Sequence, residues 1–269
     1  MAQGTVVIFD SEKGGVGKSF LSMSFTEWVW HRLRLPVVVV ECNAEIPDVG
    51  RRFKDDIPVV NIDVRAPGGW SRIADVVDQH KGKIVVVNLP SNVAGYFPED
   101  RRGTLSGMRR LLDVRVLLAW VLNHEVDGIL ALRREVKRSG QSIPDVVVIP
   151  NLIHSRLKDF AWMQSQTRVT MAEKGNLELV FPELWSPMAV TFRQVGVSFD
   201  EMRKGLATDK DGNLFPAGVR LTLFDWLRRT DLLWDGLAVE MGWSRPEATN
   251  QNDESSTNEP LPDADSEVA

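Results

Sequence analysis

The amino-acid sequence predicts an α/β fold, with a mostly parallel central sheet and helices on both of its faces. Short apolar runs rich in valine alternate with segments of helical periodicity, which is typical of a parallel sheet. The first run, Thr5 to Phe9 (TVVIF), is apolar at every position, as expected for a strand buried on both faces. A glycine-rich turn, KGGVGKS, follows it and leads into a segment of helical spacing.

The remaining elements follow the same alternation along the chain. Strands are predicted over residues 5–10, 36–41, 59–64, 83–89, 115–120, 145–150 and 177–181. Helices are predicted over residues 18–33, 71–79, 104–112, 124–139, 155–174 and 221–241. Parallel sheets of this kind bind ligands at the carboxyl ends of their strands, so chemistry is expected near Glu41, Leu89 and Asn151.

The glycine-rich turn has the features of an anion site. Free backbone N–H groups and the positive end of the helix dipole meet where a strand leads into a helix. Gly14, Gly15 and Gly17 allow the backbone to curl about a phosphate chain, and Val16 and Phe20 are expected to bind the cofactor together with them. A lysine in such a turn reaches the β- and γ-phosphates, and a hydroxyl beside it ligates Mg²⁺. Lys18 and Ser19 supply these groups, which predicts a fold of the phosphate-loop NTPase type.

The turn departs from the general phosphate-loop pattern, because Glu12 stands where that pattern has its first glycine. It resembles instead the deviant Walker A motif of the ParA/MinD family of ATPases. The resemblance implies that ATP and Mg²⁺ are the cofactors and that the chain forms an ATP-dependent homodimer. In that family the extra lysine, here Lys13, crosses the dimer interface to the nucleotide of the other subunit, while Lys18 serves its own.

Two carboxylates that the family places near the γ-phosphate are amides in this sequence. The family's second strand ends in DxD, whose second aspartate positions the attacking water, and the matching stretch VVVVECN has Asn43 there. A later strand ends in DxP, whose aspartate holds Mg²⁺ through a water, and the matching stretch IVVVNLP has Asn88. An amide cannot accept a proton and carries no charge. We therefore expect ATP hydrolysis that is weak or absent, with Mg²⁺ held mainly by Ser19 and phosphates.

Acidic residues in the same loops could compensate for the missing carboxylates. These are Asp10, Glu41, Glu45 and Asp48. For Glu41 two interpretations remain open, a carboxylate at a strand end that faces water or a basic partner, and a role in the site.

The base-binding part of the site is predicted only from resemblance. The stretch VVVIPN resembles the family's strand whose last asparagine lies near adenine, which indicates Asn151, although a simple turn asparagine after Pro150 also fits. The stretch that begins at Leu179 (LVFPELWSPMAVTFRQVGVSFDEM) resembles the family's closing segment, so the backbone of residues 182–184 is expected to contact the base. Neither NKxD nor TKxD, which specify guanine, occurs in the chain.

Composition predicts one soluble domain with an acidic tail. The 269 residues, 43% of them hydrophobic, suffice for one α/β domain, which we expect over residues 1–245. Seven of the 37 acidic residues and none of the 32 basic ones lie in residues 246–269, which leaves the body about two charges positive. This tail is expected to be disordered, either as a solubilising terminus or as a competitor of DNA for the body. The apolar runs are too short to span a bilayer, and Cys42 is the only cysteine, so a cytoplasmic protein is expected.

The basic residues indicate DNA as a partner. Partition ATPases of the family bind DNA non-specifically, whereas a membrane surface would repel the acidic tail. Candidate contacts are Arg133, Arg134, Lys137 and Arg138 in one cluster, and Arg101, Arg102, Arg109 and Arg110 in another, although charge runs are more often solvated helix faces. The predicted function is DNA positioning, as in plasmid partition, stability or conjugative transfer, with a ParB-like or other adaptor as a further partner. The alternatives are a non-catalytic ATP-locked switch or adaptor, and an ATPase that positions a cargo other than DNA.

Overall fold

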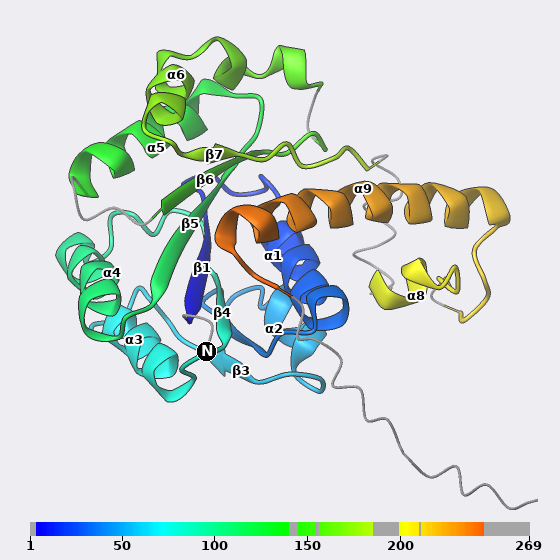
Figure 1. Ribbon diagram of the computed structural model, residues 1–269, viewed down its shortest axis with the longest axis horizontal. Helices are drawn as coiled ribbons and strands as arrows, with labels where there is room; N and C mark the ends of the chain where they lie inside the picture. The colour runs from blue at the N-terminus through cyan, green and yellow to red at the C-terminus, as the bar shows by residue number, and fades with distance from the viewer. Residues whose placement is uncertain (1–3, 140–144, 154–155, 185–198, 210, 245–269) are drawn as a thin grey trace, which may run out of the picture.

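A computed structural model describes residues 4–139, 145–153, 156–184, 199–209 and 211–244 (Figure 1). Its centre is one sheet of seven strands, all of them parallel, in the order β3-β2-β4-β1-β5-β6-β7. The strands are β1 (Thr5–Asp10), β2 (Val37–Glu41), β3 (Val59–Asn61), β4 (Ile84–Asn88), β5 (Arg115–Leu122), β6 (Asp145–Pro150) and β7 (Leu177–Glu178). The predicted α/β class and the parallel sheet are confirmed.

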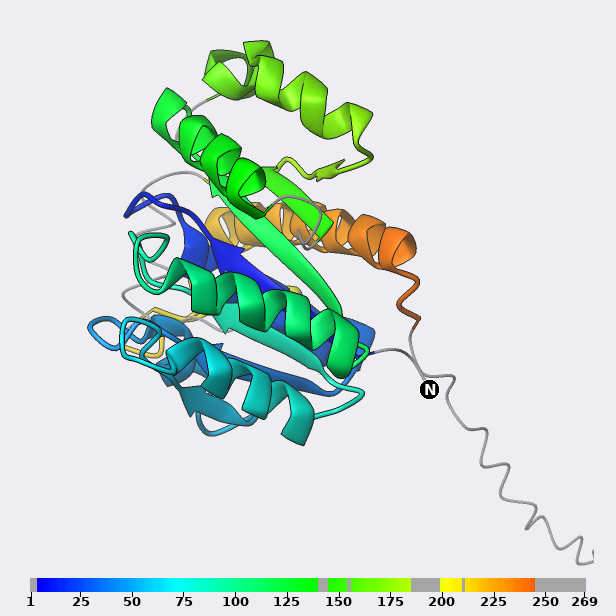
Figure 2. The same cartoon turned by 90° about the vertical axis from the view of Figure 1, so that its left-hand side faces the viewer.

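Helices cover both faces of the sheet (Figures 1 and 2). One face carries α3 (Gly69–Gln79), α4 (Pro98–Leu111), α5 (Val126–Ser139) and α6 (Gln166–Glu173). The other carries α1 (Lys18–Glu27) with its π-helical continuation Trp28–Leu33, α2 (Asp48–Phe53), α8 (Phe199–Arg203) and the long α9 (Ala217–Met241). None of the helices in the described ranges is long and apolar enough to cross a membrane.

The strands are buried on both faces because their alternate residues enter two different cores. Val7 and Phe9 of β1 pack against α1 and α9, whereas Val6 and Ile8 pack against the helices of the opposite layer. The core beneath α9 is aromatic, and Trp234 meets Phe9 and Phe25 edge to face or nearly so. Both faces of β1 are therefore packed against helices. This packing holds the carboxyl end of the strand, where the glycine-rich turn begins, in place.

Several helices begin earlier than the sequence predicts. Helix α4 starts at Pro98 rather than near residue 104, because proline fits the first helical position and Glu99 and Asp100 complement the helix dipole there. Helix α9 starts at Ala217, immediately after Pro216. The short helix α2 is absent from the prediction, since its six residues are too few for a clear periodicity.

The helix predicted over residues 155–174 forms only in its second half, as α6. The chain forms two short 3-10 turns, Leu157–Asp159 and Ala161–Gln164, before α6 begins. Phe160 lies between the turns in an extended conformation and is buried. Ser165 then starts a new helix, because its hydroxyl accepts a hydrogen bond from the backbone of Arg168. Burial of Phe160 and this cap therefore override the helical pattern. The predicted acidic tail and residues 185–198 of the predicted closing segment lie outside the described residues.

Candidate phosphate-binding site

The glycine-rich turn joins β1 to α1 and is shaped by its glycines. Gly15 and Gly17 have φ angles of 75° and 99°, in the region that favours glycine. A Cβ on Gly17 would lie 2.3 Å from Nδ2 of Asn151, so a larger residue is excluded there on two grounds. Around Gly15 no other described atom would lie within 4 Å of an added Cβ, so the turn borders open space there.

Asn151 supports this turn from beneath. It is fully buried at the end of β6, and its Nδ2 donates a hydrogen bond to the carbonyl of Val16 at 2.9 Å. Its Oδ1 accepts from the backbone of Ile153 at 3.3 Å, as a turn asparagine would. The side chain therefore holds the backbone of the turn, and its predicted position near adenine stays a prediction.

Lys18 is the buried cation of the site. Its Nζ donates to the carbonyl of Lys13 at 3.2 Å and to Oγ of Ser91 at 3.0 Å. Burial lowers the pKa of Lys18 to about 8, and the nearby Asp10 only partly offsets this effect. A phosphate would restore the missing negative charge beside Lys18, so the site is electrostatically suited to an anion.

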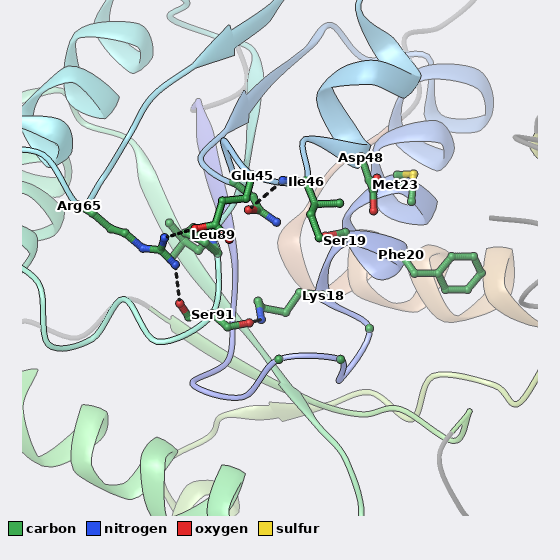
Figure 3. Close-up of a pocket in the computed structure, with 15 residues that line it drawn as sticks. Lys18, Ser19, Phe20, Met23, Glu45, Ile46, Asp48, Arg65, Leu89 and Ser91 are labelled. Atoms are coloured by element: carbon green, nitrogen blue, oxygen red, sulfur yellow. Dashed lines mark hydrogen bonds and ion pairs between the residues drawn. The ribbon is translucent and has the colours of Figure 1, made fainter. Parts of the chain in front are cut away.

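A cavity of about 350 Å³ opens over the turn (Figure 3). It is lined by Gly14, Gly15, Gly17, Lys18 and Ser19 on one side and by residues of the loops after β2, β3 and β4 on the other. No side chain in the described part of the chain caps the N-terminus of α1, so its dipole points into this space. The cavity, the open turn and the helix end fit a chain of phosphates.

Asn88 faces Ser19 with its donor nitrogen. The Nδ2 group of Asn88 donates to Oε1 of Glu41 at 2.9 Å and lies 3.4 Å from Oγ of Ser19. Because an ionised carboxylate only accepts, the bond to Glu41 fixes which end of the amide points this way. Oδ1 of Asn88 is buried and has no hydrogen-bond partner among the described residues. An amide so oriented cannot accept a hydrogen bond from a metal-bound water at its nitrogen.

Glu41 is buried and forms no ion pair with any residue in the described ranges. It is 2% exposed and accepts four hydrogen bonds, from Nδ2 of Asn88 and from the backbone N–H groups of Asn43, Val49 and Gly50. Two of these donors belong to the first turn of α2, so the carboxylate caps that helix from the end of the preceding strand, β2. Burial raises the pKa of Glu41 above its ordinary value, against the hydrogen bonds that favour the charged form.

The other acidic residues differ in their availability. Asp10 is buried and accepts from Arg101 at 2.7 Å and from the backbone of Ser11 at 2.7 Å. Asn43, Glu45 and Asp48 line the cavity (Figure 3). Oδ1 of Asn43 accepts from the backbone of Ile46 at 3.4 Å, which turns the amide toward its own loop. Asp48 makes no side-chain hydrogen bond or ion pair with another described residue, so its carboxylate is the uncommitted one.

The predicted DNA contact at Arg101, in the second basic cluster, is wrong because this residue is buried. It is 3% exposed, and its guanidinium lies between Asp10 and Glu135, 2.7 Å and 3.1 Å away, over the ring of Trp70. The residue links the end of β1 to α4 and α5 and cannot reach DNA. Its neighbours Arg102, Arg109 and Arg110 are exposed, as are all four basic residues of the cluster on α5.

Lys13 and Glu12, at the start of the turn, form ion pairs with residues of α5 and of the loop before it. Lys13 forms an ion pair with Glu125, in the loop between β5 and α5, and Glu12 accepts from Arg134 at 2.6 Å. The side chains of Lys13 and Glu125 are each 39% exposed, so this pair is weak and open to exchange.

Phe20 and Leu184 are buried in the aromatic core, whereas Pro182 is half-buried and Glu183 is exposed. Phe20 is 3% exposed and packs against Trp226 with ring centroids 5.6 Å apart. The carbonyl of Pro182 accepts a hydrogen bond from the indole of Trp226. Sequence reasoning missed Ser91 and Arg65, because neither belongs to a motif and only the fold brings their loops to the cavity.

The chain was compared with known protein families, sequences and solved structures. No family model matches the chain. The chain is 24% identical over 243 residues, 88% of its own length and 99% of the relative's, to Protein MobD of Acidithiobacillus ferrooxidans. Among solved structures, the MinC:MinD cell division protein complex of Aquifex aeolicus matches 85% of this chain and 95% of that one, with a TM-score of 0.45 and 16% identity. The septum site-determining protein MinD of Pyrococcus horikoshii OT3, complexed with Mg-ADP, matches 90% and 99%, with a TM-score of 0.44 and 13% identity.

The order of the strands and the shape of the turn define the fold. The chain has an all-parallel fold of the phosphate-loop type, and its turn KGGVGKS resembles the deviant Walker A motif of ParA/MinD ATPases.

Proposed function

We propose that the protein binds ATP with Mg²⁺ at the turn between β1 and α1 and is a nucleotide-dependent dimer that hydrolyses ATP slowly or not at all. The observation that carries this proposal is the arrangement of Ser19, Asn88 and Glu41. A hydroxyl suited to Mg²⁺ is present, but the residue behind it offers an amide nitrogen and no charge.

The binding half of the proposal rests on the chain's own donors. Lys18, the N-terminal turn of α1 and the backbone around Gly15 converge on one cavity. Ser19 would hold Mg²⁺ together with phosphate oxygens, since none of the described residues form a cluster of three His, Cys, Asp or Glu side chains that could hold a metal. Bound Mg²⁺ would neutralise phosphate charge.

Slow hydrolysis follows from the way each nearby carboxylate is used. Glu41 is committed to four donors and Asp10 to Arg101, so neither is available to orient a water. Glu45 also lines the cavity but pairs with Arg65, so Asp48, which has no side-chain partner among the described residues, is the carboxylate proposed to substitute for the missing ones. Any residual turnover should therefore depend on Asp48.

Dimer formation is supported by the surface around Lys13. A second hollow beside the turn is lined by Glu12, Lys13, Leu130 and Arg134, and Leu130 and Val126 of α5 are exposed apolar residues close to it. Lys13 can leave the weak pair with Glu125 when a partner subunit offers a phosphate. This face would meet a second copy of the chain.

DNA is the proposed cargo, and Arg133, Lys137 and Arg138 the proposed contacts. They are exposed on the outer side of α5, while the neighbouring Arg134 is engaged by Glu12. Non-specific binding through phosphates needs no more than such a basic face. A switch or adaptor that acts on a partner protein is the second candidate, and the amide at position 88 favours it because such a device needs binding without turnover.

The test is steady-state ATP turnover with Mg²⁺, with and without DNA, in the wild type, Lys18→Ala and Asp48→Asn. We expect ATP binding that Lys18→Ala abolishes, with turnover below about 0.01 per second, far under the 1–100 per second of kinases. Fast turnover that needs Lys18 would refute slow hydrolysis, and an absence of ATP binding would refute the whole proposal. If the Asp48→Asn substitution by itself removes the residual turnover, Asp48 is the carboxylate that replaces the missing ones.

A further inference from the structure

Arg65 is a second cation at the cavity, and no motif accounts for it. It follows β3, and its backbone is fixed by a hydrogen bond from its N–H to Oδ1 of Asp63 at 2.8 Å. Its Nη2 donates to the carbonyl of Ser91 at 3.2 Å, and its Nη1 donates to Glu45 at 3.2 Å (Figure 3). The guanidinium therefore points across the cavity mouth from a loop far in sequence from the phosphate turn.

Ser91 connects Arg65 to Lys18. Its Oγ accepts from Nζ of Lys18 at 3.0 Å, and its carbonyl accepts from Arg65. Both cations thus meet one residue of the loop after β4, and both line the same cavity. Ser91 spaces them so that an anion between the two would be contacted from both sides.

The position of Arg65 indicates which part of a ligand it would meet. In the sheet, β1 is followed by β4, then β2, then β3, so the cavity extends from the turn after β1 toward the loop after β3. In Figure 3, Arg65 lies at the far end of the cavity from Phe20, with Lys18 between them. A phosphate chain that runs past Lys18 toward this end would place its last phosphate nearest Arg65.

The guanidinium is available for such a contact. Glu45, its present ion-pair partner, is 77% exposed, and an ion pair with so exposed a carboxylate contributes little. Nε of Arg65 is buried and has no partner among the described residues. The planar fork of arginine matches two oxygens of a phosphate and is already pre-organised. A phosphate can therefore replace the carboxylate of Glu45 with little further loss of side-chain entropy. The ring of Tyr96, 5.9 Å from the guanidinium carbon, restricts its swing.

We propose that Arg65 recognises the terminal phosphate of a nucleoside triphosphate and gives the site its preference for a triphosphate over a diphosphate. This proposal rests on the proposed function, because it assumes that nucleotide binds at the turn. The competing explanation is that Arg65 only ties the loop of Glu45 to the loop of Ser91. In that case its removal would loosen the cavity for every ligand alike.

The experiment compares the Kd of a non-hydrolysable ATP analogue with that of ADP by calorimetry. The variants are Arg65→Gln, Arg65→Lys and Glu45→Gln, with Arg72→Gln on the exposed side of α3 as the matched control. A charged hydrogen-bond pair supports a loss of about tenfold in triphosphate affinity for Arg65→Gln, with ADP affinity changed less than about twofold. Arg65→Lys should fall between, and Arg72→Gln and Glu45→Gln should keep or exceed the wild-type ratio.

Each alternative result has its own meaning. Equal weakening of both ligands by Arg65→Gln, or no weakening of either, overturns the role of Arg65 and leaves the proposed function intact. A wild type that binds neither ligand overturns the proposed function and this inference with it. If Arg65→Gln does not fold, the ratio measured for Arg65→Lys decides, because that variant keeps the charge and loses only the planar fork.

Discussion

Asn88 donates a hydrogen bond to Glu41 at 2.9 Å, between the buried carboxyl ends of β4 and β2. This bond holds the amide nitrogen of Asn88 toward Ser19, so a hydrogen-bond donor faces the hydroxyl. It also occupies the carboxylate of Glu41, which is then not available to a ligand. The amide of Asn88 and the carboxylate of Glu41 on the adjacent strand therefore depend on each other.

Asn88→Asp should destabilise the protein instead of repairing the site. It places a second carboxylate against Glu41 in a buried position, at a cost of about 1–3 kcal/mol in unfolding free energy at pH 7. The double variant Glu41→Gln with Asn88→Asp should recover part of this loss, since a carboxylate then faces an amide again. Denaturant unfolding measures both, with Asn61→Asp at the exposed end of β3 as control. A single variant as stable as the wild type contradicts the coupling.

Gly17→Ala should abolish nucleotide binding, because the new Cβ would lie 2.3 Å from Nδ2 of Asn151 at a φ of 99°. Asn151→Ala removes the clash but also the hydrogen bond to Val16, and should weaken ATP and ADP binding alike by about tenfold. Calorimetry on both single variants and the double variant checks this. Gly17→Ala binding as tightly as the wild type would show that the turn does not need its observed shape.

The low pKa of Lys18 predicts a specific dependence of stability on pH. The folded pKa is about 8 and the ordinary value is 10.5, so between these values the unfolded chain binds the proton more tightly than the folded one. The unfolding free energy of the ligand-free wild type should therefore rise with pH across this window, relative to Lys18→Met. Below about pH 8 the difference between the two should be constant. Parallel curves at every pH would disprove the assigned pKa.

Glu125→Gln should promote ATP-dependent dimer formation by releasing Lys13 from its ion pair. Because both side chains are partly exposed, the unfolding free energy should change by less than about 0.5 kcal/mol. Light scattering across a range of protein concentrations measures the dimer, and Glu99→Gln, which breaks the exposed pair with Arg102, is the matched control. An unchanged dimer constant means that Glu125 does not restrain Lys13.

Replacing Arg133, Lys137 and Arg138 together by glutamine should weaken DNA binding. The plot of log K against log salt concentration should become less steep, its negative slope decreasing in size by about two to three. The control replaces Arg228 and Arg229 on α9, which are paired with Asp225. An unchanged salt slope rejects α5 as the DNA surface. Absence of DNA binding in the wild type favours the switch or adaptor.

The sequence predicts the sheet and the phosphate turn well, because both depend on local signals. Apolar runs such as Val37 to Val40 and the glycines of the turn are readable without the fold. Local sequence patterns do not predict which polar residues on separate elements form hydrogen bonds or ion pairs with each other. Glu41 caps α2 and orients Asn88, and Arg101 is buried between Asp10 and Glu135, only because separate loops and helices meet. A charge run therefore predicted a DNA contact at Arg101, where the fold makes an internal ion pair.

The central claim is that ATP locks a dimer without being consumed quickly. The most direct test is the molar mass of the protein in solution, followed over hours after addition of ATP with Mg²⁺, beside an ADP sample. The account predicts a dimer that forms with ATP alone and persists for hours while the nucleotide remains ATP. A mass that stays monomeric with ATP, or a dimer that disappears within minutes as ADP accumulates, would contradict it.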